Sequence, residues 1–441
     1  MAEPVQHLAS GQDAAPVFPP VERRAVFYVP GFDPRGARRY RALYASEGRK
    51  QTSISGGSIR VSAPKAEDHK LSFQIEAAWG EPASNHEGEA TQHGPPLVMT
   101  DYTVLRWDDL VTKRMQAPLW RRIARGVWVY ARQIAKGAVP GMLRLAKTPA
   151  IATLFPLIVV LVYLAVATAI GFGTPSLFGQ LFGGSYLAWL PAGLALGAIY
   201  LAFTRWLDRY TYAYYLLDFY SMMVSYAEGK EPALEQRLEV FADIVTDAVL
   251  SERYDEIVVV GHSGGSFLAA GVLARVIATD PLFGQPEKGR HLTRLALLTL
   301  GQTMSAHGQI AGSERQWREF ASIARTPQLM WLDVSSKADG ASYALCDPLA
   351  HYQDTLPSEE RLSGPLVLSA RFGETMGKAK FKRLRRRFFR LHFQYLYAFE
   401  SPDDYDYFAI TAGPVPLAER YRQRPSNKRA PKLARELGPA T

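Results

Sequence analysis

The sequence predicts an α/β protein whose mostly parallel sheet is flanked by helices and interrupted by a two-helix transmembrane hairpin. Two observations lead to this prediction. Short β-branched runs such as residues 257–260 alternate along the chain with segments such as 233–250, in which apolar residues recur at helical spacing. Between the early strands and the later ones, residues 148–204 contain no charged side chain in 57 consecutive positions. Alternating strands and helices indicate a largely parallel sheet, and the uncharged stretch indicates membrane-embedded length.

The expected elements divide the chain into six parts. Residues 1–20 are an irregular, disordered lead without the apolar core of a signal peptide. The predicted strands cover residues 25–32, 58–61, 71–79, 102–107, 256–260, 295–300, 329–334 and 365–372. The predicted helices cover residues 35–47, 210–226, 233–250 and 313–325, and a further helix follows residue 265. One α/β domain is therefore formed by residues 21–110 and 205–420, with a basic segment (111–147) and a hairpin (148–204) between them and a polar, loose tail (421–441) after them.

The charge and cysteine content of this chain of 441 residues limit the partners and the covalent or metal cross-links that it can have. Its formal net charge is +9, and residues 111–147 hold nine Lys or Arg and no acid, so this segment alone equals the excess. Such a local excess favours an anionic membrane surface or nucleic acid as neighbour. Cys346 is the only cysteine, which excludes an intramolecular disulfide and any Cys-based zinc site.

The uncharged segment is long enough for two membrane spans. Residues 149–170 and 186–203 each supply roughly the ~20 apolar residues needed to cross a ~30 Å hydrocarbon core, and residues 171–185, rich in Gly, Phe and Ser, suit a turn. Both outer flanks are basic, so the positive-inside tendency places both ends of the hairpin, and the α/β domain with them, in the cytoplasm. Residues 117–147 interleave cations with Trp120, Trp128 and aliphatic residues, as in a helix lying at the membrane interface. The alternative for this segment is an ordinary solvated helix packed on the protein.

A short motif links the strand at 256–260 to the helix after residue 265. Gly261, Ser263 and Gly265 form the pattern G-x-S-x-G between a strand and a helix, which resembles the nucleophile elbow of the α/β-hydrolases. A serine on so sharp a turn exposes its hydroxyl, and the two glycines leave no side chain to collide with the neighbouring strand and helix. The resemblance covers roughly residues 24–110 and 230–415. The alternative is a tight strand-to-helix turn in a non-catalytic sheet.

The resemblance implies a catalytic triad in the chain order serine, acid, histidine. Ser263 is then the nucleophile, His392 the base and Asp339, in a loop after a late strand, the orienting acid. Asp333 and Asp347 are rivals for the acid, and His351 is a less favoured rival for the base. His291 and His307 precede the acid candidates, and His262, although adjacent to the serine, is expected to shape the pocket.

The resemblance also implies an oxyanion hole made by the backbone N–H groups of Gly264 and of Phe32, in the Pro-Gly-Phe loop after the first strand. The sequence has no Walker loop, no metal-ligand cluster and no G-x-G-x-x-G motif, so we expect neither a cofactor nor a metal. From Lys378 to Arg390 there are eight cations and no acid. Beside a membrane anchor this run suits anionic lipid headgroups better than nucleic acid, which is not expected as a partner.

The resulting hypothesis is a membrane-anchored serine hydrolase that cleaves an ester or a thioester through an acyl-enzyme on Ser263. A lipid-like substrate is expected because an anchored active site meets molecules dissolved in the bilayer. Membrane lipids would contact residues 117–204. Two alternatives remain open at this stage: a non-catalytic membrane scaffold of hydrolase fold, and an acyltransferase that uses the same triad on an alcohol acceptor.

Overall fold

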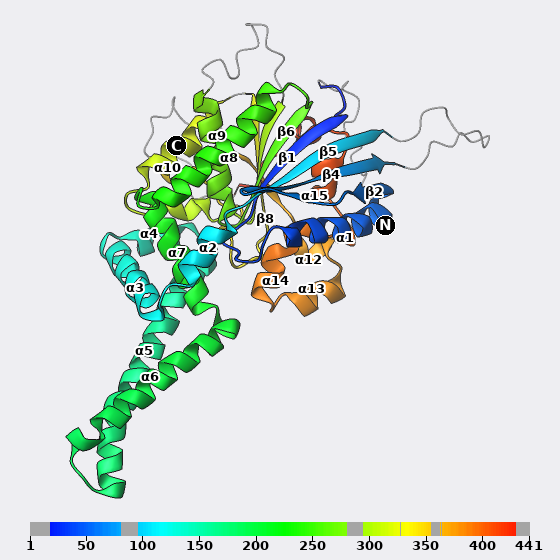
Figure 1. Ribbon diagram of the computed structural model, residues 1–441. Coiled ribbons are helices and arrows are strands. Elements are labelled where there is room, and N and C mark those ends of the chain that lie inside the picture. The colour runs from blue at the N-terminus through cyan, green and yellow to red at the C-terminus, as the bar shows by residue number, and fades with distance from the viewer. Residues whose placement is uncertain are drawn as a thin grey trace, which may run out of the picture.

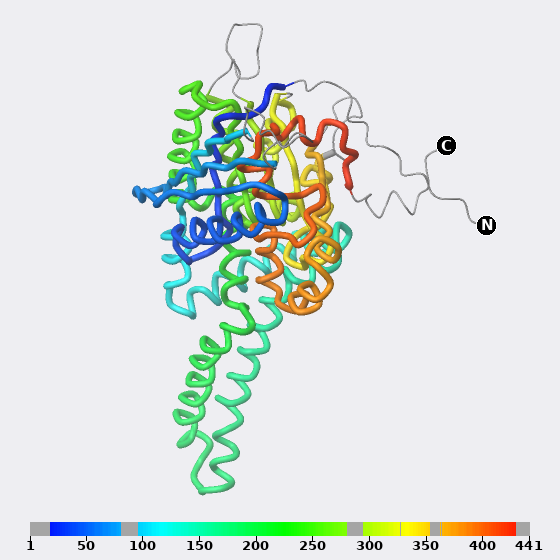
Figure 2. Tube along the Cα trace, turned by 90° about the vertical axis from the view of Figure 1, so that its right-hand side faces the viewer, coloured from blue at the N-terminus to red at the C-terminus, as the bar shows by residue number. Residues whose placement is uncertain are grey.

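The computed structural model describes residues 18–80, 96–279, 294–326, 328–353, 362 and 364–428. It has a body built on a single mixed sheet with helices on both faces, and a long two-helix arm that projects from one end of that body (Figures 1 and 2). The predicted α/β class is therefore confirmed. Most of the expected irregular lead, and His291, lie outside the described residues.

The sheet has the strand order β2-β4-β5-β1-β6-β7-β8-β9, and the short β3 pairs with β4. The pairings β5-β1, β1-β6, β6-β7, β7-β8 and β8-β9 are all parallel, whereas β4 is antiparallel to β2, β3 and β5. The strands are β1 (Arg23–Val29), β2 (Gly57–Val61), β3 (Lys65–Ala66), β4 (Lys70–Trp79), β5 (Leu97–Leu105), β6 (Glu256–His262), β7 (Arg294–Leu300), β8 (Leu329–Ser335) and β9 (Leu366–Ser369). Each predicted strand overlaps one of them.

The helices cover both faces of the sheet, and every predicted helix overlaps an observed one. The helices are α1 (Arg38–Ser55), α2 (Asp108–Met115), α3 (Leu119–Ala135), α4 (Ala138–Leu145), α5 (Lys147–Phe182), α6 (Tyr186–Thr211), α7 (Ala213–Ala227), α8 (Pro232–Leu250), α9 (Gly265–Thr279), α10 (Glu314–Ala324), α11 (Ala350–Gln353), α12 (Phe372–Thr375), α13 (Lys378–Leu384), α14 (Phe388–His392), α15 (Tyr407–Ala412) and α16 (Leu417–Arg420). Two 3₁₀ turns, η2 (Met304–Gln309) and η4 (Phe393–Leu396), complete the described structure.

Alternation along the central strands divides the core into two layers. In β1, Phe27 faces the layer that includes α7, α8, α9 and α10, whereas Val26 and Tyr28 face the layer that includes α1, η4 and α15 (Figure 1). In β6, Val259 faces the first of these layers and Val258 faces the second. Successive side chains of a strand point to opposite faces, so a sheet covered on both sides needs strands that are apolar throughout. All seven residues of β6 are buried, as this arrangement requires.

A buried ion pair ties the two central strands to the C-terminal segment. The Arg24 guanidinium, at the start of β1, donates from Nε to Glu256 Oε2 at 2.8 Å, and both side chains are almost wholly buried. Arg24 also donates to the carbonyl oxygens of Gly413 and Val415, and the N–H of Leu417 donates to Glu256 Oε1 at 2.6 Å. Each charge therefore has several hydrogen-bond partners, which a buried pair needs to offset its desolvation.

The arm consists of α5 and α6, which pack along each other as a hairpin (Figure 2). Both helices are long and apolar enough to span a membrane. Their contact is made by small residues: a Cβ built on Gly193 would lie 2.4 Å from the carbonyl oxygen of Gly171, and one on Gly197 would lie 2.7 Å from that of Ala167. Gly193 and Gly197 form a G-x-x-x-G pattern, which permits such close backbone approach between apolar helices.

The hairpin differs from the predicted one in the length of its first helix. Residues 171–182, which were expected in the turn, continue α5 as far as Phe182, so the turn is only residues 183–185. The expectation was wrong because glycine and proline, which break helices in water, are tolerated in an apolar helix that must satisfy its own backbone hydrogen bonds. Pro175 lies inside α5 and packs against Gly193 of α6.

The basic segment also differs from the expected single interfacial helix. It forms the end of α2, all of α3 and all of α4, and three of its cations pair with acids of the body. Arg114 pairs with Glu231, Arg122 with Asp218 and Arg132 with Glu228. One face of α3 thus packs on α7, as in an ordinary surface helix, while Trp120 and Trp128 are each 66% exposed on its other face.

The start of the expected loose tail lies against the edge of the sheet. Tyr421 is buried, the N–H of Asn427 donates to the carbonyl oxygen of Val367 at 2.7 Å, and the Ser426 hydroxyl accepts from the N–H of Val367 at 3.0 Å. Residues 421–428 therefore cover β9, the last strand of the sheet. An uncovered edge strand would leave its backbone groups unpaired, which explains why a polar segment is ordered here.

The Arg24–Glu256 pair yields a prediction about stability. Either Arg24→Met or Glu256→Met leaves the other charge buried without its partner, so each is expected to lower the free energy of unfolding by about 3–5 kcal/mol. The double variant should lower the free energy of unfolding by much less than the sum of the two single effects. Chemical denaturation of the detergent-solubilised protein, followed by tryptophan fluorescence, measures this double-mutant cycle. Strictly additive costs would contradict the pairing, and Arg60→Met, in the exposed Arg60–Glu76 pair, is the control that should change stability little.

Candidate active site

The elbow lies where β6 ends and α9 begins. Ser263 has a φ of 56°, a left-handed conformation that is strained for a side chain other than glycine. The turn is held by close backbone packing: a Cβ on Gly265 would lie 2.2 Å from the carbonyl oxygen of Val29, and one on Gly261 would lie 2.5 Å from Cα of Ser266. Only glycine fits at either position, and the serine hydroxyl is presented at the carboxyl end of the central strands.

His392 and Asp339 meet although 53 residues separate them. The His392 ring, at the end of α14, donates from Nδ1 to Asp339 Oδ2 at 2.8 Å, and both side chains are buried. Asp339 follows β8 and also accepts from the Tyr395 hydroxyl at 3.0 Å and from the N–H of Ala341 at 3.1 Å. Burial opposes ionisation of this carboxyl, but the His392 ring and these hydrogen bonds lower the pKa of Asp339 below its usual value.

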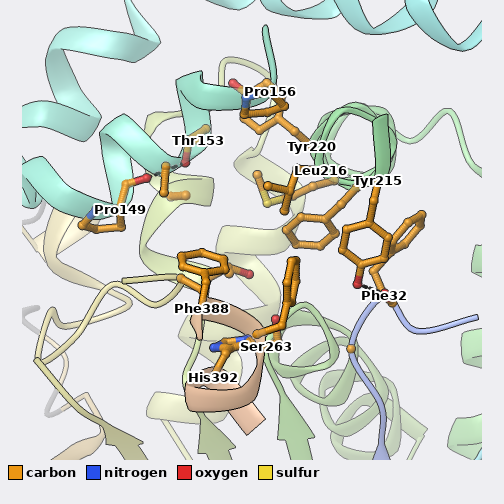
Figure 3. Close-up of a pocket in the computed structure, with 18 of the residues that line it drawn as sticks. Phe32, Pro149, Thr153, Pro156, Tyr215, Leu216, Tyr220, Ser263, Phe388 and His392 are labelled. Atoms are coloured by element: carbon orange, nitrogen blue, oxygen red, sulfur yellow. Dashed lines mark hydrogen bonds between the residues drawn. The ribbon is translucent and has the colours of Figure 1, made fainter. Parts of the chain in front are cut away.

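The other nitrogen of the His392 ring is left available. Because Nδ1 carries the proton that it shares with Asp339, Nε2 of neutral His392 has a lone pair, and within the described residues Nε2 has no hydrogen-bond partner. Ser263 and His392 both line one pocket, and Figure 3 shows them next to each other at its floor. No hydrogen bond joins Nε2 to Ser263 Oγ among these residues; catalytic hydrogen bonds are often longer in the absence of substrate.

His262, which precedes the serine, holds the backbone that carries His392. Its Nε2 donates to the carbonyl oxygen of His392 at 3.1 Å, and the two ring centroids lie 4.9 Å apart. Burial, with a smaller contribution from the His392 charge, lowers the pKa of His262 to about 3, so this ring is neutral near pH 7. His262 therefore contributes to the shape of the site, as the sequence suggested.

The loop after β1 brings backbone donors to the serine. A Cβ on Gly31 would lie 3.1 Å from Cβ of Ser263, so this loop packs directly against the elbow. The Tyr215 hydroxyl of α7 donates to the carbonyl oxygen of Phe32. Within the described residues, no protein group accepts from the N–H groups of Phe32 and Gly264, so both are available to a ligand.

Asp33 anchors this loop, and the sequence analysis did not single it out. The buried Asp33 carboxylate accepts from Arg35 Nε at 2.7 Å, from an Arg39 nitrogen at 2.8 Å and from the Tyr40 hydroxyl at 2.9 Å. Burial opposes its charge, but the Arg35 and Tyr40 contacts lower the pKa of Asp33. The cations at the start of α1 were a usable signal, since a carboxylate next to them completes an ionic network.

The pocket above Ser263 is mostly apolar and partly open to solvent. One wall comes from α7, another from the base of α5, and Phe388 of α14 lies between His392 and that base (Figure 3). Its lining residues, besides Ser263 and His392, include Tyr130, Pro149, Ala152, Thr153, Pro156, Tyr215, Leu216, Phe219, Tyr220, Met223, Phe388, Phe389 and Phe393. This wall could not be predicted from the sequence, because no local pattern reveals that the long apolar helix α5 reaches the site.

Asp333 and Asp347, the other candidates for the acid that orients His392, have different surroundings. Asp333 is buried in β8, where its Oδ1 accepts from the Thr299 hydroxyl at 2.6 Å, and burial raises its pKa to about 7. Asp347 pairs with Lys428 at 3.0 Å.

The other described histidines likewise have other environments. His351 Nδ1 contacts the Gln309 amide at 3.2 Å. His307 is buried, and burial lowers its pKa to about 4. Of the candidates that the sequence offered, the structure therefore brings Asp339, rather than Asp333 or Asp347, to His392.

The described residues contain no group of three His, Cys, Asp or Glu side chains that could hold a metal ion. Comparisons with family models, with curated proteins and with solved structures found no match to this chain. The chemistry open to the site follows from its own geometry: a strained serine, a histidine with one free nitrogen, and a carboxylate that fixes the other nitrogen.

This geometry predicts how the reactivity of Ser263 depends on the two buried carboxylates. Asp339→Asn should lower the rate at which a fluorophosphonate labels Ser263 by about 10³-fold or more, because an amide at this position favours the wrong tautomer of His392. Asp333→Asn should leave the rate nearly unchanged, since the Asp333 carboxyl is largely protonated below pH 7 and an amide matches its shape. Labelling time courses below pH 7 measure both. An equal loss in the two variants would contradict the assignment of Asp339.

Proposed function

We propose that the protein is a membrane-anchored serine hydrolase that cleaves carboxylic esters, or thioesters, through an acyl-enzyme. The observation that carries the proposal is the contact of His392 Nδ1 with the buried Asp339 carboxylate, which leaves Nε2 free in the pocket that Ser263 also lines. A base oriented by an acid, next to a nucleophile on a strained turn, is the arrangement that activates a serine hydroxyl.

The proposed reaction has two halves. Ser263 Oγ attacks the acyl carbon while His392 Nε2 takes its proton, and the N–H groups of Phe32 and Gly264 stabilise the oxyanion that forms. The carbonyl re-forms as the bond to the alcohol or thiol breaks, and His392 returns the proton to that leaving group. Water then attacks the acyl-serine with His392 as base, which releases the acid and restores the Ser263 hydroxyl. Asp339 stays ionised throughout and stabilises the imidazolium.

The resemblance to the α/β-hydrolases supports this proposal. In that superfamily the nucleophile, the acid and the histidine follow one another along the chain in loops at the carboxyl ends of parallel strands. Here Ser263 follows β6, Asp339 follows β8 and His392 follows β9, and these strands run parallel. The hairpin is then an insertion between β5 and β6.

The membrane anchor is supported by the surface of the arm and by its flanks. Apolar side chains of α5 and α6 are exposed along the arm, including Ile158, Leu187 and Ile199, the last two by more than 60%. Exposed apolar surface of this extent suits lipid. The exposed tryptophans of α3 suit the interface, and the basic flanks favour a body on the cytoplasmic side.

An amphiphilic substrate follows from the walls of the pocket. Pro149, Thr153 and Pro156 of α5 line the same space as Ser263, so the helix that enters the membrane also forms part of the site. An acyl chain that leaves the bilayer along α5 would reach the serine while remaining in contact with apolar side chains. Exposing each CH₂ group to water would cost about 0.8 kcal/mol, so this route is of most advantage to long-chain substrates.

Hydrolysis is tested with a p-nitrophenyl ester and the detergent-solubilised protein. We expect acid release by the wild type, its loss in Ser263→Ala and a loss of at least about 10³-fold in His392→Ala, because each variant removes a member of the catalytic unit. Ser53→Ala, an exposed serine of α1, is the matched control. Unlabelled wild type with a fluorophosphonate would support the scaffold instead, and products that appear only with an added alcohol acceptor would support the acyltransferase.

The orientation is tested by cysteine labelling, because Cys346 is buried and can be replaced to give a cysteine-free background. Ser185→Cys, at the exposed tip of the hairpin, should react with a membrane-impermeant maleimide added to intact cells. Ser53→Cys, exposed on the body, should react only after the membrane is permeabilised. Labelling of both sites in intact cells, or the reverse order, would overturn the cytoplasmic placement.

A further inference from the structure

A second hollow lies beside the pocket of Ser263, between the base of the arm and the segment that joins α13 to α14. Its apolar side is formed by Ile151, Phe155 and other residues at the start of α5. Its cationic side is formed by four arginines, Arg209 from α6 and Arg386, Arg387 and Arg390 from the α13–α14 segment. A lining that combines apolar side chains with several arginines suits an amphiphile rather than a simple ion.

The four arginines lack acidic partners within the described residues. Arg209 donates to the Tyr210 hydroxyl at 2.7 Å and its guanidinium lies 4.0 Å from the centroid of the Trp206 ring. Arg390 donates to the Gln394 side-chain oxygen at 3.5 Å and its guanidinium lies 3.4 Å from the centroid of the Tyr397 ring. Arg386 and Arg387 are exposed and bind no carboxylate of the described chain. Three arginines of the basic segment, Arg114, Arg122 and Arg132, each pair with an acid by contrast. An uncompensated cluster at a hollow therefore points to an anion supplied from outside the chain.

The hollow is continuous with the candidate active site. Ala152, Leu216, Phe388 and Phe389 line both spaces. Phe388 is 39% exposed and stands between His392 and the base of α5 (Figure 3). The same short helix, α14, begins with these two phenylalanines and ends with His392. A ligand that occupies both spaces thus lies over Phe388 and Phe389, with one end at Ser263.

We propose that this arginine hollow binds the phosphate headgroup of the substrate, and that the substrate is an anionic, phosphate-bearing acyl ester taken from the membrane. This inference rests on the proposed ester hydrolysis and adds the substrate class. The acyl carbonyl lies at Ser263, the acyl chain lies along the pocket wall of α5 and α7, and the phosphate lies among Arg386, Arg387 and Arg390. Arginine suits this role because its planar fork donates two parallel hydrogen bonds to phosphate oxygens.

The occupant is a lipid ester rather than free phosphate because of the apolar half of the hollow. Ile151 and Phe155 are 59% and 40% exposed, and inorganic phosphate has no apolar part to contact them. They lie at the start of the helix that enters the membrane, where a lipid would pass from bilayer to site. The headgroup end and the ester end of such a lipid are therefore matched by two adjoining surfaces of different chemistry.

Binding is tested without reliance on catalysis, in the Ser263→Ala protein in neutral detergent. By isothermal titration calorimetry, hexadecyl phosphate should bind about tenfold more tightly than zwitterionic hexadecylphosphocholine, a difference expected for charged hydrogen bonds. Arg386→Ala/Arg387→Ala should remove this preference, and Arg386→Lys/Arg387→Lys should retain part of it. Lys382→Ala/Arg383→Ala removes the same charge from the same run outside the hollow and should keep the preference.

Hydrolysis is tested in parallel with phosphatidic acid and phosphatidylcholine of equal acyl chains in mixed micelles. The ratio of the two kcat/KM values should exceed about ten in the wild type and fall toward one in the Arg386→Ala/Arg387→Ala variant. Preferential binding without hydrolysis of either lipid would refute the proposed function and leave the headgroup site standing. Hydrolysis of both lipids at equal rates would overturn the headgroup site alone. Equal losses of preference in the two double-alanine variants, or full competition by inorganic phosphate, would also overturn it.

Discussion

The parallel pairing of β1, β6, β7 and β8 is the constraint on which the site depends. In the register of β1 with β6, Val29 lies opposite Gly261. The loop that carries Phe32 therefore begins beside the loop that carries Ser263. The close contact of Gly265 with the Val29 carbonyl then fixes the distance between them. Because parallel strands end at the same edge of a sheet, β8 delivers Asp339 to that edge as well. The Arg24–Glu256 pair lies at the amino-terminal ends of β1 and β6, at the edge of the sheet away from the site. It stabilises the pairing of these two strands in the interior, where water is excluded.

Some of this arrangement was predictable from the sequence because it depends only on patterns of neighbouring residues. Ser263 lies within five residues whose spacing already describes the turn, and the apolar runs describe the strands on either side. Asp339 and His392 were named from chain order, but order did not separate Asp339 from Asp333 or Asp347. That choice depends on which carboxylate reaches a ring 53 residues away, and on how burial changes the pKa of each.

Other parts could not be predicted because they depend on contacts between distant elements. The cations of α3 were assigned to the membrane, yet Arg122 lies against Asp218 of α7, a pairing that a charge count does not contain. Likewise, Pro175 and the glycines around it indicated a turn, although the same small residues allow α5 and α6 to approach closely. The G-x-x-x-G at Gly193 and Gly197 was a signal that would have corrected the length of the first helix.

The position of the arm gives the site its chemical character. A pocket walled only by the helices of the body would meet ligands from water, whereas here α5 of the arm contributes Pro149 and Thr153 to the pocket. Moving a long acyl chain from a bilayer into water costs about 0.8 kcal/mol for each CH₂ group, so a route along an apolar helix avoids most of that cost. The phosphate cannot follow that apolar route without a partner, because an unpaired charge is costly to desolvate. In the proposed substrate complex, Arg386 and Arg387, which precede Phe388 directly, meet that requirement and hold the ester between the two ends.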